Sequence, residues 1–149
     1  MERPLLEISI VTLASPDYAE VFALRDEVLR KPLGMSLKND DLSRDAVDVI
    51  FAGKMDGKVV VCLMLHHKND DLVQLRQMAV YDAWQGRGLG RQLVEAAEQY
   101  AREKGYRTLV LHARKNAMGF YGSMGYAVVG DEFTEVGIPH YIMEKALQQ

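Results

Sequence analysis

The segment 85–90, QGRGLG, has the composition of a phosphate-binding turn, because three glycines alternate with longer residues. Glycine has no Cβ, so the backbone of such a turn can approach a ligand closely and point several N–H groups towards it. The segment lies between an apolar run and a helical pattern, and a helix N-terminus favours phosphate through its N–H groups and its dipole. Arg87 and Arg91 are four residues apart and would add positive charge at the rim.

Three other interpretations of this turn fit the residues less well. A plain strand-to-helix turn rarely needs three glycines in five positions. A Walker loop requires Gly-Lys-Ser/Thr, whereas Gly90 is followed here by Arg91-Gln92. A dinucleotide-binding unit requires G-x-G-x-x-G and an acidic residue about 20 positions later, which the strand at 108–114 lacks. Arg114 could contact a 2′-phosphate, but the antiparallel strands expected upstream argue against a Rossmann unit.

Hydrophobic periodicity and turn residues predict the elements that position this turn. Strands are expected at 5–14, 49–55, 58–67, 72–81, 108–113, 126–129 and 141–145, and helices from Ser15-Pro16 to the residue before Pro32, at 86–104 and at 117–124. Asp56-Gly57 and Asn69-Asp70-Asp71 are tight turns, so three successive antiparallel strands follow. The next strand–helix–strand unit should be a right-handed parallel crossover. The fold class is therefore α/β (α+β-like), with a mixed, mostly antiparallel sheet.

The segment 35–48 is polar and weakly periodic, and we interpret it as a loop with a short helical turn. A connector of about a dozen residues is long for a compact domain and is typical of a substrate-facing segment. A solvated excursion is the alternative.

Composition excludes several classes of protein. The 149 residues fit one domain, 1–149, and the net charge of −3 gives no basic field for nucleic-acid binding. No run of about 18 apolar residues could span a membrane. The stretch 1–14 lacks the apolar region of a signal peptide, so a soluble cytoplasmic protein is expected.

Cys62 is the only cysteine, which excludes an intramolecular disulfide. It lies in an apolar run at 59–65 and is expected to be a small buried hydrophobic residue. No metal site is expected, because His66-His67 has no companion ligands.

The turn and the residues around it resemble the GNAT superfamily of N-acetyltransferases. Gln85-x-x-Gly88-x-Gly90 after the strand Gln77-Met78-Ala79-Val80 is similar to the loop with which this family binds the pyrophosphate of acyl-CoA. The family pattern continues through Leu111-His112-Ala113-Arg114, Asn116-Ala117, Phe120-Tyr121, Gly125-Tyr126 and the closing GIPHYIM at 137–143, which is similar to a tail of small bacterial members. The resemblance is strongest over 72–145.

The resemblance implies a GNAT-like fold in which a central parallel pair of strands splays apart, flanked by helices, and receives the pantetheine arm. Backbone groups of Met78 and Val80 would contact that arm, and one N–H would polarise the thioester carbonyl. By similarity, the positions that bind acetyl-CoA are Met78, Ala79, Val80, Gln85, Gly86, Arg87, Gly88, Leu89, Gly90, Arg91, Asn116 and Phe120.

Tyr121 matches the residue that commonly protonates the departing CoA thiolate in this family. A phenol with a pKa of about 10 can give a proton to a thiolate of comparable basicity. The alternative is a structural aromatic residue packed beside Phe120.

The general base is less clearly marked, although an amine must lose a proton to attack a thioester. Many family members carry Glu on the strand before the loop, whereas this chain has Arg76-Gln77 there. His140, Glu135 and His112 are the remaining candidates, and His140, next to Pro139, is preferred because Pro139 should interrupt a regular strand.

The sequence therefore predicts an N-acetyltransferase that transfers an acetyl group from acetyl-CoA to a primary amine by direct attack in a ternary complex. A non-catalytic acyl-CoA-binding sensor or interaction module is the alternative. The run Asn39-Asp40-Asp41 and the acidic residues Asp131, Glu132 and Glu135 would favour a cationic acceptor, or simply form a solvated face. No nucleic-acid or membrane partner is expected, and an edge strand would be available for a homodimer.

Overall fold

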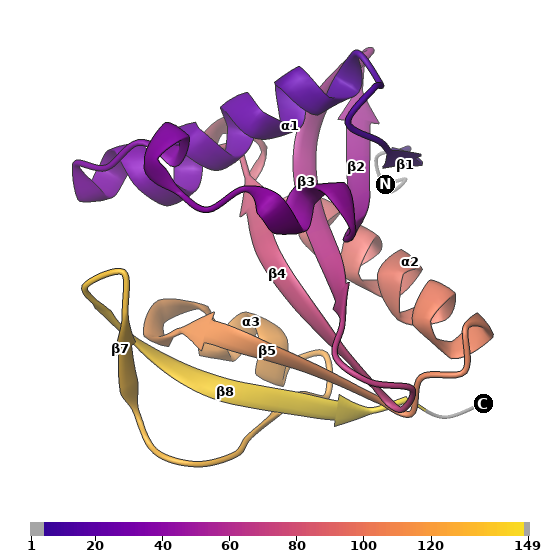
Figure 1. Cartoon of the computed structure of the whole chain (residues 1–149), viewed down its shortest axis with the longest axis vertical. Coiled ribbons are helices and arrows are strands. Elements are labelled where there is room, and N and C mark those ends of the chain that lie inside the picture. The colour runs from indigo at the N-terminus through magenta and orange to yellow at the C-terminus, as the bar shows by residue number, and fades with distance from the viewer. Residues whose placement is uncertain (1–4, 148–149) are drawn as a thin grey trace. The chain divides into compact units, whose positions relative to one another are not determined.

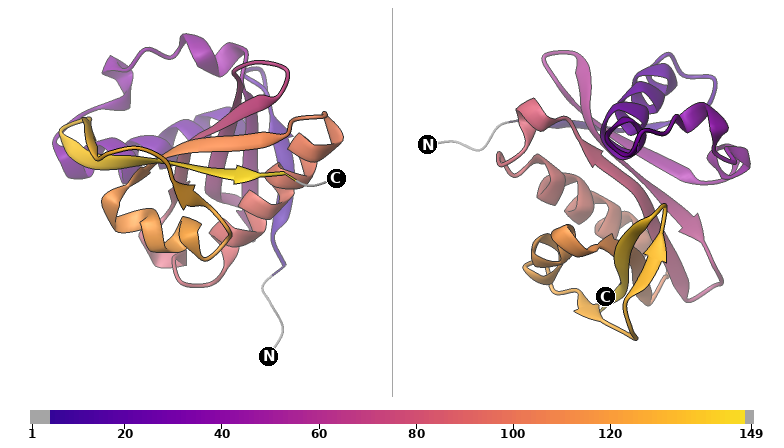
Figure 2. Two further views of the ribbon diagram at one scale, coloured as in Figure 1. Left: turned by 90° about the horizontal axis from the view of Figure 1, so that it is seen from below. Right: turned by 90° about the vertical axis from the view of Figure 1, so that its left-hand side faces the viewer.

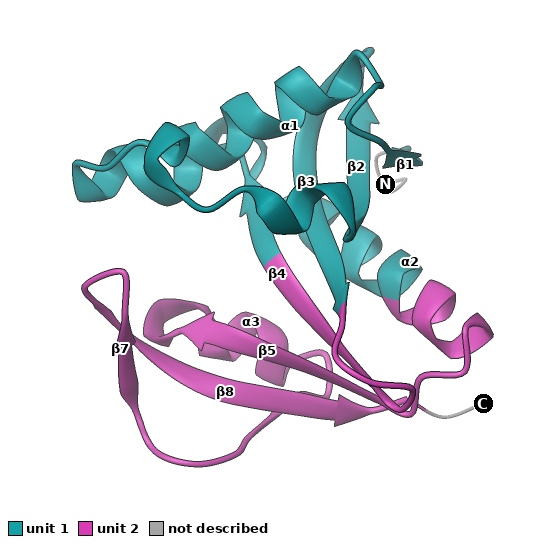
Figure 3. Ribbon diagram, viewed as in Figure 1, with its two compact units in different colours: residues 1–66, 77–97 teal, residues 67–76, 98–149 magenta. Residues whose placement is uncertain are grey.

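The computed structural model of the chain describes residues 5–147 and contains two compact units (Figure 3). Unit 1 comprises the chain up to residue 66 together with 77–97, and unit 2 comprises 67–76 together with the chain from residue 98. The three boundaries between them, 66/67, 76/77 and 97/98, fall inside the strand β3 (Lys58–His67), the strand β4 (Leu72–Val80) and the helix α2 (Leu89–Glu103). The expected domain, 1–149, and the stretch 1–14 both include residues outside the described range.

A strand and a helix come first along the chain, followed by three consecutive strands, a second helix, a strand, a short helix and three further strands (Figure 1). The strands are β1 (Glu7–Val11), β2 (Val49–Met55), β3 (Lys58–His67), β4 (Leu72–Val80), β5 (Thr108–Arg114), β6 (Ala127–Val128), β7 (Phe133–Glu135) and β8 (Ile138–Ala146). The α-helices are α1 (Asp17–Arg25), α2 (Leu89–Glu103) and α3 (Met118–Gly122). The strand order is β1-β2-β3-β4-β5-β8-β6, with β7 beside β8.

The sheet confirms the predicted mixture of strand directions. The pairs β1–β2, β2–β3, β5–β8, β6–β8 and β7–β8 are antiparallel. The pair β4–β5 is parallel, with Leu72↔Thr108 to Leu75↔Leu111 in register. This parallel pair is the one that the crossover through α2 requires.

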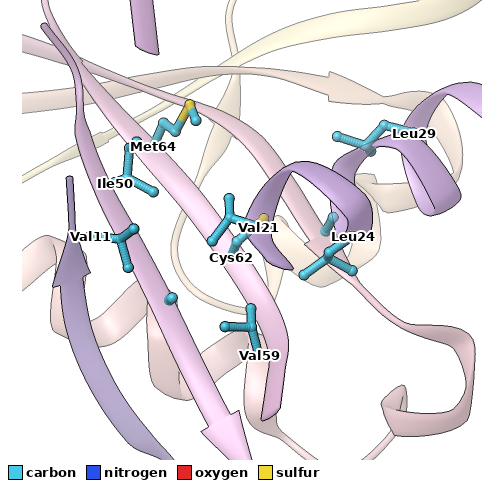
Figure 4. Packing of buried hydrophobic residues seen from close by; sticks show 10 residues of the cluster. Val11, Val21, Leu24, Leu29, Ile50, Val59, Cys62 and Met64 are labelled. Carbon is cyan, nitrogen blue, oxygen red and sulfur yellow. The ribbon is translucent and has the colours of Figure 1, made fainter. Parts of the chain in front are cut away.

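Unit 1 is built on the predicted hairpin of β2 and β3, whose turn residues Asp56 and Gly57 have φ of +52° and +78°. Further views show α1 on one face of these strands and the first half of α2 on the other (Figure 2). Val21 and Leu24 of α1 pack on Cys62 and its neighbours (Figure 4). Cys62 is fully buried, as predicted, and burial raises the pKa of its thiol to about 12.

The helix expected up to Pro32 is shorter than predicted. The α-helix ends at Arg25, a π-helical turn covers Asp26–Arg30, and a 3₁₀ turn covers Lys31–Leu33 and so contains Pro32. Gly34, with φ of +70°, ends this run. Proline fits the start of a 3₁₀ turn because its missing N–H is not needed there.

Helix α2 begins at Leu89 and not at Gly86 as predicted, because Gly86 and Gly88 both have φ of +78°, outside the right-handed helical region. It ends as predicted before Gly105, whose φ is +88°.

Unit 2 differs from the prediction at its C-terminal strands. A short strand, β7, was missed, and β8 begins at Ile138 rather than Tyr141, so Pro139 lies inside a strand and does not interrupt it. The pairing with β5 ends at Arg114↔His140, one residue after Pro139, so no N–H of Pro139 is required by β5.

Candidate functional site

Unit 1 contains the glycine-rich turn. Gln85 ties it to the preceding strand, because its Nε2 donates to the Val80 carbonyl at 3.0 Å and to Asp82 Oδ1 at 3.2 Å. The Arg87 guanidinium stacks over the Trp84 ring, 4.7 Å from its centroid, which keeps a positive charge beside the turn.

Gly86 and Gly88 adopt the left-handed conformation that favours glycine. A Cβ added at either position would meet no other atom within 4 Å, so conformation and not crowding calls for glycine here. The Gln92 N–H donates to the Gly88 carbonyl at 3.1 Å, which places the start of helical hydrogen bonding at this glycine. The first N–H groups of a helix have no acceptor within it, so the turn presents donors suited to phosphate.

The residues expected to contact the acyl arm form the end of β4 in the same unit. Ala79 is buried, while Met78 and Val80 are half-buried. Gln77, just before them, has φ of +56°, which is rare for a residue other than glycine inside a strand and is typical of a β-bulge.

Unit 2 contains the remaining predicted residues. Asn116 is exposed in a 3₁₀ turn after β5 (Lys115–Ala117), and Phe120 and Tyr121 follow on α3. The Tyr121 ring packs edge-on against the rings of Phe120 and Tyr126, with centroids 5.0 and 5.8 Å away. Burial raises the pKa of Tyr121 above its usual value, so the hydroxyl stays protonated.

The three candidate bases lie together in unit 2, joined by the Glu135 carboxylate. Glu135 Oε1 lies 3.0 Å from His112 Nδ1, and Glu135 Oε2 lies 3.6 Å from His140 Nε2. The Phe133 ring contacts both imidazoles, at centroid distances of 5.3 and 5.8 Å. The sequence proposed these residues as alternatives, whereas the structure makes them one cluster.

The tautomer of His140 follows from its second contact. Its Nδ1 lies 2.9 Å from the Ile138 carbonyl oxygen, which can only accept, so Nδ1 carries the hydrogen. A neutral His140 therefore has its lone pair on Nε2, beside Glu135 Oε2. This arrangement can take up a proton at Nε2 and stabilise the resulting charge.

A family model for the acetyltransferase (GNAT) domain matches residues 39–147. The chain belongs to the GNAT family of acetyltransferases. The uncharacterised protein YyaT of Bacillus subtilis is 34% identical over 76 residues, 51% of each chain. The uncharacterised N-acetyltransferase YjcF of the same organism is 27% identical over 129 residues, 85% of this chain and 90% of YjcF. The chain spans about half the length of the curated relatives that it matches above 30% identity.

Solved structures agree with this membership of the GNAT family. An acyl-CoA N-acyltransferase from Pseudomonas aeruginosa is 25% identical and superposes with a TM-score of 0.80 over 95% of this chain and 100% of that one. Members of the GNAT family use acyl-CoA, and the mixed sheet with its parallel pair β4–β5 is the fold of these neighbours.

The residues that the sequence predicted for the site fall into two groups. Unit 1 holds Met78, Ala79, Val80, Gln85, Gly86, Arg87, Gly88, Leu89, Gly90 and Arg91, and unit 2 holds Asn116, Phe120, Tyr121 and His140. Among residues 5–147, no group of three or more His, Cys, Asp or Glu is arranged to hold a metal ion. None of the helices in that range has the length and apolar character needed to cross a membrane.

Sequence reasoning missed a buried polar network in unit 1. The Arg25 guanidinium donates from Nη1 to Asp45 Oδ2 at 2.7 Å and from Nε to Gln77 Oε1 at 3.2 Å. The Tyr18 hydroxyl also donates to Asp45 Oδ2. One signal was available: Arg25 lies four residues after Val21 and four before Leu29, on the apolar face of the helical pattern.

The segment 35–48 is anchored to the rest of unit 1 and is not simply a solvated excursion. Leu37 is completely buried, its N–H donates to Asp26 Oδ1 at 2.8 Å, and Asp45 is buried beside Arg25. Arg30 donates to both carboxylate oxygens of Asp40, at 2.7 to 3.2 Å. Its expected role in facing the substrate remains a prediction.

Proposed function

We propose that this GNAT protein transfers the acetyl group of acetyl-CoA to a primary amine by direct attack within a ternary complex. The observation that carries the proposal is the turn at 85–90, where Gly86 and Gly88 are left-handed at the start of α2 and Gln85 ties the turn to the end of β4. That arrangement supplies backbone donors for a pyrophosphate in a chain whose family uses acyl-CoA.

Within unit 1, the backbone N–H groups of 87–90 would hold the pyrophosphate of acetyl-CoA. Met78 and Val80 of the same unit would offer backbone groups to the pantetheine arm. One of these N–H groups would donate to the thioester carbonyl and stabilise the oxyanion that develops there. Asn116 is exposed and can donate to the same arm.

The chemical step forms one C–N bond and breaks one C–S bond. The amine nitrogen attacks the thioester carbon, the tetrahedral intermediate collapses, and CoA leaves as the thiolate. His140 Nε2 would accept the proton that the amine loses, with Glu135 stabilising the imidazolium. Tyr121 would protonate the thiolate, so the products are an amide and CoA thiol.

The Tyr121 hydroxyl is protonated at neutral pH and so carries a proton for the thiolate, although burial raises its pKa and makes it a weaker acid than a free phenol. The Tyr121→Phe variant keeps the ring and its contacts with Phe120 and Tyr126. We expect kcat to fall about 10-fold to 100-fold while the Kd for acetyl-CoA changes less than twofold. Steady-state kinetics and calorimetry measure the two quantities, and an unchanged kcat would remove Tyr121 from the mechanism.

Cys62 is the only thiol that could form an acyl-enzyme, and its state argues against one. The side chain is fully buried, and its raised pKa of about 12 leaves almost no thiolate at neutral pH. Direct transfer is therefore the route that these residues support.

The acidic residues that suggested a cationic acceptor are largely paired within the protein. Asp40 accepts from Arg30, Glu132 from Lys115 and Tyr141, and Glu135 contacts two histidines. They give little free negative charge with which to select a cation, so the acceptor is proposed only as a primary amine.

The test is to incubate the protein with acetyl-CoA and a panel of small amines, amino sugars and lysine peptides, and to follow free thiol. Thiol release that depends on one acceptor class supports the proposal. A protein that acetyl-CoA does not stabilise against heat would contradict it.

One observation favours a second candidate, a non-catalytic acyl-CoA sensor. Gln77 occupies the strand before the loop where many GNAT proteins have Glu, and its side chain is bonded to Arg25. Thermal stabilisation by acetyl-CoA without thiol release on any amine would favour the sensor.

A further inference from the structure

Arg25 is the point at which three segments of unit 1 meet. It ends α1, and its side chain is only 1% exposed. A guanidinium has donors in a fixed fork, and here one edge contacts Asp45 while Nε contacts Gln77. The two partners are 20 and 52 residues away in sequence, so one side chain joins the segment 35–48 to the strand β4.

Gln77 is the residue of β4 whose conformation needs support. Its φ of +56° is uncommon for a side chain larger than glycine, and such residues persist where their surroundings hold them. Two contacts do so: Arg25 Nε on the side chain, and the Cys62 thiol 3.6 Å from the Gln77 carbonyl oxygen. The next three residues are those proposed to contact the acyl arm of acetyl-CoA.

The other end of the network fixes the segment 35–48 through Asp45. Oδ2 accepts from both Arg25 and Tyr18, whereas Oδ1 is buried with no hydrogen-bond partner among residues 5–147. An unpartnered buried oxygen costs stability, and a buried ion pair contributes little net stability of its own. The network is therefore better suited to fixing geometry than to stabilising the fold.

We propose that Arg25 is a positioning residue, which holds Gln77 in its left-handed conformation and locks the segment 35–48 to the part of β4 that receives acetyl-CoA. One consequence of this positioning rests on the proposed function: loss of the Arg25–Gln77 contact should weaken the binding of acetyl-CoA. The positioning itself is a property of the free protein.

The chain supplies a matched control in Arg30. This second arginine also pairs with an aspartate of the same segment, Asp40, and its remaining bond goes to the Leu29 carbonyl. Arg30→Lys therefore disturbs the segment without touching Gln77. Arg25→Lys keeps a cation beside Asp45 but loses the fork that also reaches Gln77.

The first experiment is hydrogen exchange on the free full-length protein. We expect the amides of residues 77–80 to exchange at least tenfold faster in Arg25→Lys than in the wild type, and to change less than twofold in Arg30→Lys. Gln77→Asn should act like Arg25→Lys, because asparagine tolerates the left-handed conformation but is too short for the contact. It also leaves the buried ion pair intact, so the test survives if Arg25→Lys fails to fold. Equal acceleration in the Arg25 and Arg30 variants, or none with Gln77→Asn, would overturn the proposal.

The second experiment measures the Kd for acetyl-CoA by calorimetry. We expect an increase of about tenfold in Arg25→Lys and in Gln77→Asn, no further increase in the double variant, and less than twofold in Arg30→Lys. If the wild type does not bind acetyl-CoA, the proposed function fails, while hydrogen exchange still decides the role of Arg25. If the wild type binds and these two variants bind as tightly, the positioning of acetyl-CoA by Arg25 fails alone.

Discussion

The network around Arg25 and the cluster around Glu135 each join a carboxylate to two or more partners, but they differ in access to water. In unit 1 the side chains of Arg25 and Asp45 are 1% and 2% exposed. In unit 2 those of His112 and Glu135 are 34% and 45% exposed, whereas that of His140 is 4% exposed. A charge sealed from solvent can fix backbone geometry but cannot readily exchange protons. The cluster in unit 2 keeps contact with water, because the half-exposed Glu135 carboxylate contacts the buried His140 imidazole. In the proposed function, unit 1 would therefore supply the binding geometry and unit 2 the groups that transfer protons.

The most direct test of the proton-transfer role proposed for unit 2 is to replace His140. Glutamine at this position can still donate to the Ile138 carbonyl, so the local fold should survive, but it cannot take up a proton. We expect His140→Gln to lower kcat about 100-fold or more, with the Kd for acetyl-CoA within twofold of the wild type.

His112→Gln is the matched control, since His112 also contacts Glu135. It should lower kcat severalfold at most. A larger loss in His112→Gln than in His140→Gln would move the base to His112, and an effect of either on Kd rather than kcat would contradict the division between the units.

A substitution in the glycine turn at 85–90 tests the binding role that is proposed for unit 1. Alanine at position 88 would be strained by about 1–2 kcal/mol, because Gly88 has φ of +78°. The backbone should therefore shift, so that its N–H groups no longer point towards the pyrophosphate. We expect Gly88→Ala to raise the Kd for acetyl-CoA about tenfold.

Gly34→Ala controls for strain alone, because Gly34 also has a positive φ, +70°, and open space around an added Cβ. It should cost similar stability in denaturant unfolding yet leave the Kd unchanged. Equal effects of the two substitutions on Kd would mean that the turn at 85–90 does not bind the ligand.

A smaller effect on kcat is expected at Glu135, which in the proposed mechanism supports the base without accepting the proton from the amine. Glu135→Gln should lower kcat about fivefold, since the imidazolium of His140 loses its nearest negative charge. Glu132→Gln, close by in sequence and bonded to Lys115 and Tyr141 instead, should change kcat less than twofold. Indistinguishable kcat values for the two variants would show that Glu135 plays no part.

The smallest predicted effect concerns a buried polar cluster in unit 2. It tests whether the burial of a polar cluster, and not the unit in which it lies, decides whether the cluster supports the fold or transfers protons. Tyr126 donates to Glu98 Oε2 at 2.7 Å, and Lys145 Nζ donates to the same carboxylate. Burial, followed by this bond, raises the pKa of Tyr126 above its usual value. Tyr126→Phe should lower the free energy of unfolding by about 1 kcal/mol.

The pH dependence of that difference has a definite sign. The folded protein keeps the Tyr126 proton at pH values where the unfolded chain loses it, so the contribution is present below about pH 10 and lost as the pH rises further. Denaturant unfolding of wild type and variant should therefore converge above about pH 10. A difference that grows with pH would contradict the assignment.

Turn chemistry explains which elements could be predicted. Asp56-Gly57 suits two left-handed positions and predicted its hairpin to the residue. Val136-Gly137 makes a similar turn, with φ of +46° and +77°, but a β-branched residue is not a recognisable turn signal, so β7 and the start of β8 were missed.

The candidate site also has parts that the sequence could predict and parts that it could not. The glycine turn is contiguous in sequence, so its residues and their conformation could be anticipated. The histidine cluster could be anticipated only as separate candidates, because 23 residues separate His112 from Glu135 and periodicity does not encode their contact. The role of Arg25 was missed because its partners are also distant in sequence, Asp45 by 20 residues and Gln77 by 52, and only its place on an apolar helix face indicated a buried charge.

The sealed thiol of Cys62 has a practical consequence for labelling. Towards maleimide reagents at neutral pH the folded chain should behave as a cysteine-free protein, because its one thiol is buried and protonated. Cysteines introduced at the exposed positions Lys58 in unit 1 and Lys104 in unit 2 can then carry spin labels without replacement of Cys62. Distance distributions between such labels, with and without acetyl-CoA, would report how the two units are placed in solution.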